Sequence, residues 1–158
     1  YPCLHEGDPG EAVIFGERFP TNDGRAKFVP CDIVNPNELP DETYPMVLLT
    51  GRLLEHWHTG TMTRRTPVLD RLEPEAMAHL APTDLDKFGL RAGDRICVQS
   101  RRGEIELTAR LDIAVQPGTL FIPFCYAEAA ANLLTNAALD PFGKIAEVKY
   151  CAVKITAM

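Results

Sequence analysis

The stretch that decides the fold class is RICVQSRRGEIELTARL, residues 95–111. Its second half alternates strictly between apolar and polar residues, which is typical of a half-buried β-strand. The side chains expected to face a core are Ile105, Leu107, Ala109 and Leu111. Arg101, Arg102 and Gly103 predict a tight turn between the halves, with both arginines solvated at its tip. The stretch therefore predicts a β-hairpin.

Further short β-rich runs flank this hairpin. Strands are predicted over 46–50, 95–100, 104–111, 119–122 and 147–155, while 73–80 fits either a strand or a short helix. A helix is predicted over 82–88, because proline suits a first turn and Gly89 suits the position just past the end. The alanine-rich run 126–134 also favours a helix. Several short strands with brief helices between them predict a barrel-like β domain.

Composition limits the class of protein. The 158 residues include 16 Lys and Arg against 22 Asp and Glu, giving a net charge of -6. These values exclude collagen-like, coiled-coil and wholly disordered chains, and the mild acidity argues against a nucleic-acid partner. The longest apolar stretch is too short for a membrane span. Five scattered cysteines without a C-x-x-C motif predict reduced thiols.

The charge is divided unevenly along the chain. Residues 1–45 hold nine acidic and three basic side chains and seven of the 13 prolines, whereas the remainder is neutral. We therefore predict a lead and linker over 1–43 and a folded body over 44–158. Within the lead, Asn22-Asp23-Gly24 predicts a hairpin or tight turn.

The chemistry-bearing residues gather in LTGRLLEHWHTGTMTRR, residues 49–65. Arginine side chains, hydroxyls and ring N–H groups at this density suit an anionic ligand, although a polar loop with solvated arginines fits equally well. His56 and His58 would face the same way on a strand and could chelate a metal, but no third ligand follows, so packing or hydrogen bonding is preferred. No metal site is predicted.

Other single residues allow two interpretations each. Asp84 fits a contact with a heterocyclic base or simply a charge at a helix N-terminus. Asn132 is unexpected in a helical run and could pair with a heterocycle. Lys149 is either an outward strand residue or a cation facing a ligand. No G-x-S-x-G, Walker or G-x-G-x-x-G motif is present, so no catalytic residue is predicted.

Taken in order, these motifs resemble the C-terminal dinucleotide-binding domain of the molybdopterin oxidoreductases, most closely that of the formate dehydrogenase catalytic (alpha) subunit. The matching stretches are 49–65, 74–76, 82–84, 93–94, 100–104, 117–118, 129–135 and 148–153. The segment RFPTNDGRA, residues 18–26, resembles the tail of the preceding domain in that family.

The resemblance implies a double-psi β-barrel, a mainly β fold with six strands in a mixed barrel and short helices. It implies binding of molybdopterin guanine dinucleotide, which carries Mo or W in the parent enzyme. The iron–sulfur cluster and the metal ligand would belong to upstream domains, so this piece alone is not expected to catalyse formate oxidation. Upstream domains and electron-transfer subunits are the expected partners.

Carried over by motif, the resemblance implies ten cofactor-binding residues. They are Thr50, Gly51, Arg52, His56, His58, Thr59, Asp84, Phe124, Asn132 and Lys149. Phe124 stands where the family can have a tyrosine, and there it lacks the hydroxyl.

Three alternatives to a formate enzyme stay open. The same domain occurs in nitrate and arsenite enzymes, and a non-enzymatic adaptor could use the same barrel. A self-cleaving decarboxylase is disfavoured, because the chain has no Gly-Ser dipeptide. The expected compartment is the cytoplasm, with the periplasm as the alternative, because the chain starts at Tyr1 rather than Met and an original targeting segment could be missing.

Overall fold

A computed structural model describes residues 1–158, which divide into two compact units, Tyr1–Val34 and Asn35–Met158. The second unit holds every helix and strand. The strands are β1 (Met46–Gly51), β2 (Met77–Leu80), β3 (Arg95–Gln99), β4 (Glu104–Leu111), β5 (Thr119–Pro123) and β6 (Tyr150–Ala157). The helices are η1 (Thr63–Arg65), α1 (Pro67–Leu72), α2 (Pro82–Phe88), η2 (Ala127–Ala129) and η3 (Ala131–Leu133), where η marks a 3-10 turn.

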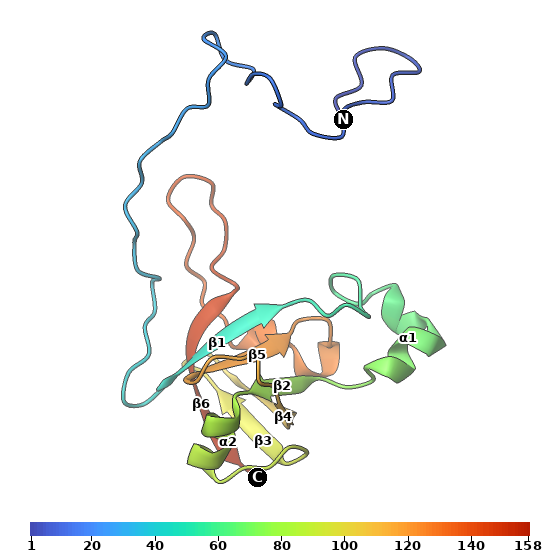
Figure 1. The fold of residues 1–158 in the computed structure, drawn as a ribbon. Helices are drawn as coiled ribbons and strands as arrows, with labels where there is room; N and C mark the ends of the chain where they lie inside the picture. The colour runs from blue at the N-terminus through green and yellow to red at the C-terminus, as the bar shows by residue number, and fades with distance from the viewer. The chain divides into compact units, whose positions relative to one another are not determined.

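The six strands close into a barrel in the order β1-β5-β2-β4-β3-β6 (Figure 1). Strand β1 is parallel to β5 and antiparallel to β6, and β2 is parallel to β4, so the barrel is mixed. The predicted fold class, a mainly β six-stranded mixed barrel with short helices, is confirmed. Parallel neighbours place the carboxyl ends of β1 and β5 side by side, and this position matters for the site below.

Alternating apolar residues fill the barrel interior. Leu48, Leu80 and Leu120 come from three adjacent strands, and all three are fully buried. In β4 the predicted alternation holds for Ile105, Leu107 and Ala109, which are buried. The prediction that Leu111 faces the core is wrong, because this residue ends the strand where the chain leaves the barrel and is 49% exposed.

Two local predictions can be judged against the structure. Helix α2 is confirmed, with proline in its first turn and Gly89 in the left-handed conformation (φ 64°) at its end. The helix predicted over 126–134 is wrong, because Ala130 adopts an extended conformation (φ −68°, ψ 103°) between η2 and η3. Ala129 and Ala131 are buried on either side of that break, so packing overrides the helix propensity of alanine.

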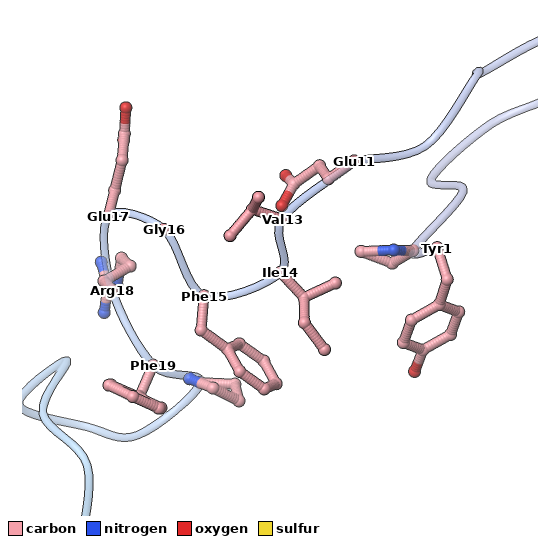
Figure 2. Close-up of a pocket in the computed structure, with 11 residues that line it drawn as sticks. Tyr1, Glu11, Val13, Ile14, Phe15, Gly16, Glu17, Arg18 and Phe19 are labelled. Atoms are coloured by element: carbon pink, nitrogen blue, oxygen red, sulfur yellow. The ribbon is translucent and has the colours of Figure 1, made fainter.

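The N-terminal unit has turns but no helix or strand. A tight turn is present where Asn-Asp-Gly predicted one, since the Phe19 N–H donates to Gly24 O at 2.9 Å. A hollow of about 730 Å³ is lined by apolar residues such as Ile14 and Phe15 (Figure 2). Figure 2 shows these two side chains on one side of the backbone and Glu17 pointing away from them. None of the ten predicted site residues lines this hollow.

All five cysteines are free, as predicted, and Cys125 and Cys151 are buried among apolar side chains. Burial raises the pKa of the Cys151 thiol to about 11, so this thiol is protonated at neutral pH.

No helix of the structure is long and apolar enough to cross a membrane.

Candidate functional site

One end of the barrel gathers the carboxyl ends of β1 and β5 and the amino end of β6. Gly51 pairs with Pro123 across the first two strands, and Leu49 pairs with Tyr150 across β1 and β6. The Phe124 N–H donates to Gly51 O at 3.1 Å, and the Thr50 hydroxyl donates to Val148 O at 2.7 Å. We call this the site end, because nine of the ten predicted binding residues lie there.

The loop after β1 packs against the chain that follows β5. Gly60 is buried with φ 74°, and a Cβ on it would lie 2.8 Å from Cys125 O. His58 reaches the same segment, with its ring edge-on to Phe124 at 5.5 Å between centroids. Only glycine allows this close approach of two backbones, so Gly60 sets the position of the loop over β5.

His56 is buried and bonded on both ring nitrogens. Its Nε2 lies 2.8 Å from Glu73 O, and because a carbonyl only accepts, this nitrogen carries the proton. Its Nδ1 then accepts from the Thr63 hydroxyl at 3.3 Å, while that hydroxyl accepts from the Trp57 N–H at 3.0 Å. Both nitrogens are therefore used within the protein, and His56 holds the loop in shape.

Thr63→Val is expected to lower the free energy of unfolding by about 1–3 kcal/mol, because it leaves the partly buried Nδ1 of His56 and the more exposed Trp57 N–H without their partner. Thr63→Ser keeps the hydroxyl and serves as the matched control, with a smaller loss. Urea unfolding followed by the fluorescence of Trp57, the single tryptophan, measures both. Equal losses in the two variants would show that the hydroxyl does not hold the loop.

Tyr126 and Glu73 complete the support beneath the loop. The Tyr126 hydroxyl donates to Glu73 O at 2.9 Å, and burial raises its pKa, so it stays protonated. The Glu73 carboxylate binds Arg110 of β4 through two bonds of 3.0 and 2.9 Å. This residue thus ties the loop to the barrel wall through both its carbonyl and its side chain.

The paired arginines of the loop differ sharply. Arg64 binds both carboxylate oxygens of Glu128 at 2.6 and 2.7 Å, binds Asp70 at 3.2 Å, and lies over the ring of Tyr126. Its charge is therefore already compensated. Arg65 is exposed and has no side-chain bond, so only the second arginine is free to meet an anion.

The exposed donors at the site end suit an anionic ligand with a polar heterocycle. Arg52 is exposed, its side chain forms no hydrogen bond or ion pair, and its guanidinium lies over the face of Trp57, 5.9 Å from the ring centroid. Lys149 and Asn132 are exposed and their side chains are not bonded within the protein, while the Thr59 hydroxyl pairs with Thr61. Free cations suit a diphosphate, and a free amide can both donate to and accept from a base. The donor set fits a dinucleotide.

Asn132 reaches the site end from η3, beside the β3–β4 hairpin. Arg102 donates from Nε to Leu134 O at 2.8 Å, just past η3. Both hairpin arginines are exposed, as predicted, but each also forms an ion pair with Glu38, and Arg101 binds Asp41 as well. The linker that supplies these carboxylates follows no periodic pattern, so no local signal in the sequence indicates the pairing.

Asp84 is the one predicted residue that the structure places elsewhere. It is buried in α2 and accepts from the Gly118 N–H at 2.7 Å, at the amino end of β5. Five residues of strand, roughly 16 Å, separate that point from Phe124. Its carboxylate thus anchors the opposite end of the barrel.

His56 and His58 also differ too much for a shared metal. One ring is buried and fully bonded, whereas the other belongs to an exposed residue in the left-handed region (φ 52°). No group of three or more His, Cys, Asp or Glu side chains is placed to hold a metal ion.

Comparison with known proteins gives a family and a set of relatives. Residues 46–152 match the family described as "Molydopterin dinucleotide binding domain". The F420-dependent formate dehydrogenase subunit alpha of Methanocaldococcus jannaschii is 43% identical over 98% of this chain. Subunit alpha of F420-dependent formate dehydrogenase 1 of Methanococcus maripaludis is 40% identical over the same share. The chain spans 23% of the length of each of these two relatives.

A solved structure supports the fold alone. Acetylene hydratase from Pelobacter acetylenicus superposes with a TM-score of 0.65 over 73% of this chain and 18% of its own, at 21% identity.

Proposed function

Because this chain belongs to the Molydopterin dinucleotide binding domain family, we propose that it binds and positions the molybdopterin guanine dinucleotide cofactors of a formate dehydrogenase-like oxidoreductase. The observation that carries this proposal is the convergence of nine predicted residues on one barrel end, with the Arg52 and Lys149 cations left free there. Such cations favour a diphosphate, and the cofactor itself would supply the redox chemistry through Mo or W.

The residues proposed to touch the cofactor fall into two groups. Arg52, Lys149, Asn132, His58 and Thr59 offer exposed donors, and Phe124 offers an apolar ring beside them. Thr50, Gly51 and His56 are buried, so their proposed part is to shape the backbone that meets the cofactor. Asp84 stays a prediction, and its place at the opposite end favours a structural role.

The proposed parent enzyme oxidises formate to carbon dioxide and passes two electrons to its metal centre. We place the metal ligand, an iron–sulfur cluster and the electron-transfer partners outside this chain, which spans less than a quarter of its curated relatives. These relatives are named as F420-dependent enzymes, which makes coenzyme F420 the first electron acceptor to assay. The cytoplasm remains the predicted compartment.

Arg52→Ala tests the binding role in the complete subunit. We expect cofactor affinity to fall about 10- to 100-fold, because a hydrogen bond from a charged donor contributes about 1.5–3 kcal/mol. Metal content and the guanine nucleotide released by acid hydrolysis measure the occupancy. Arg91→Ala removes an exposed arginine at the opposite end and is the control. Unchanged metal and guanine in Arg52→Ala would remove that residue from the site.

Formate oxidation is assayed separately from the cofactor content of the subunit. A subunit that binds the dinucleotide but reduces nitrate or oxidises arsenite instead would support the alternative enzymes of the superfamily. A complete reading frame without upstream domains, and without bound cofactor, would support the adaptor.

A further inference from the structure

Glu38, in the segment before the barrel, binds the barrel through its carboxylate. We call Asn37–Asp41 the strap. The Glu38 carboxylate binds Arg102 through Nη1 and Nη2 at 2.5 and 3.1 Å, and it binds Nη1 of Arg101 at 3.0 Å. The Glu38 side chain is only 13% exposed, whereas the side chains of Arg101 and Arg102 are 37% and 28% exposed, so one largely covered carboxylate pairs with two partly exposed guanidinium groups.

Glu38 also supplies a hydrogen-bond acceptor where strand β6 has no residue of β3 to pair with. Its Oε1 accepts from the Ala152 N–H at 2.8 Å. Strand β6 pairs with β3 only from Lys154 onward, so β3 has already turned away beside Ala152. A strand N–H without a partner is costly when buried, and the glutamate satisfies it.

From Glu38 the contacts continue to η3. Arg102 also donates from Nε to Leu134 O at 2.8 Å. At Gly103 a Cβ would lie 3.1 Å from Leu133 O, so the hairpin tip and η3 approach closely. Arg102 therefore links the strap, through Glu38, to the turn that carries Asn132, through Leu134.

The strap also reaches the segment that carries Lys149. The Asn37 N–H donates to the Glu147 carboxylate at 3.2 and 3.3 Å, and the Asn136 side chain donates to the same carboxylate at 3.0 Å. Glu147 stands two residues before Lys149. The strap thus contacts the stretch that carries Lys149 directly, and it is linked to the stretch that carries Asn132 through Arg102.

We propose that Glu38 is a positioning residue, which holds Asn132 through Arg102 and η3, while the neighbouring strap holds Lys149 through Glu147. Its link to cofactor binding rests on the proposed function. The strap lies before residue 46, where the family match begins, so the functional domain extends at least to Asn37.

The charge state supports this role. Hydrogen bonds from Arg102, and then from the Ala152 N–H, hold the pKa of Glu38 below its ordinary value of 4.5. A lowered folded pKa means that the stabilisation is present above the unfolded pKa and is lost as pH falls through the folded one. The stability difference between the native chain and Glu38→Gln should therefore be largest at neutral pH and shrink in acid.

Hydrogen exchange in the 158-residue chain tests the clamp. In Glu38→Ala we expect the Leu133, Leu134 and Ala152 amides to exchange about ten-fold faster or more, because they lose their support or their acceptor. The Asp112 amide, bonded to Leu80 O at the far end, should keep its rate. Glu42→Ala removes an exposed strap-side carboxylate that bonds nothing, and is the matched control.

Cofactor content in the complete subunit tests the positioning role. Guanine content should fall several-fold in Glu38→Ala and less in Glu38→Gln, which keeps the acceptor for Ala152. Gly93→Ala is the control for stability alone, because its φ of 97° is strained for alanine while nothing lies within 4 Å of the new Cβ. All variants are compared well below their unfolding temperatures.

The outcomes separate the two proposals. Uniform or absent changes in exchange would overturn the clamp. Faster local exchange with unchanged guanine content, or an equal loss in Gly93→Ala, would overturn the positioning role. If the native subunit holds no guanine nucleotide, the proposed function and the positioning role fall together, while the exchange data still decide whether the clamp exists.

Discussion

Replacing Gly60 by alanine is expected to lower the free energy of unfolding by about 2–4 kcal/mol. Two costs add at this position. Its φ of 74° is unfavourable for any residue with a Cβ. The new Cβ would also lie 2.8 Å from Cys125 O and 2.9 Å from Arg64 Cγ, and the first of these is backbone that cannot move without shifting the end of β5.

Gly89→Ala separates the two costs. It has nearly the same conformation, with φ 64°, but nothing lies within 4 Å of the methyl group that alanine would add, so only strain of about 1 kcal/mol is expected. Urea unfolding followed by Trp57 fluorescence compares the variants. If both lose the same stability, the close approach of the loop to β5 does not constrain Gly60.

The effect of Gly60→Ala should extend to the site. The loop carries Arg52 and His58, and Gly60 is where it touches the chain after β5. Displacing this contact would separate His58 from Phe124, so we expect weaker cofactor retention together with the lost stability.

Local pattern is sufficient to predict most of the barrel. Strand β4 and helix α2 agree with their predicted bounds within a residue, because strict alternation over 104–111 and the Pro82 and Gly89 boundary residues act within a few positions of the chain. The break at Ala130 is not predictable in this way. It depends on burying Ala129 and Ala131 against the barrel, which only the tertiary structure requires.

Local sequence patterns also predict the functional site only in part. The sequence could gather candidate donors in 49–65, but it could not separate Arg64, bound to Glu128, from the free Arg65. Nor could it pair Glu38 with Arg102, since they are 64 positions apart in the sequence. Which cation is free depends on carboxylates that are distant in sequence, and no local spacing encodes these.

Leu120→Ala is expected to lower the free energy of unfolding by about 2–5 kcal/mol, the usual range for truncating a buried leucine. Leu120 is fully buried in β5, with Leu48 of β1 on one side and Leu80 of β2 on the other. A barrel interior has no solvent side into which these three strands could relax, so the cavity should stay largely open and the cost should lie in the upper part of that range.

Substitutions of the neighbouring leucines test whether the three side chains pack together. If Leu80 and Leu120 share one interior cavity, their separate alanine substitutions should not add, and the double variant should differ from the sum by about 0.5 kcal/mol or more. Leu133→Ala, at a residue 59% exposed, should cost less than about 1 kcal/mol and is the control. Urea unfolding followed by far-ultraviolet circular dichroism measures all four variants. Strict additivity, or a loss in Leu120→Ala no larger than in Leu133→Ala, would mean that this row of side chains does not pack as one layer, and that the barrel is held together elsewhere.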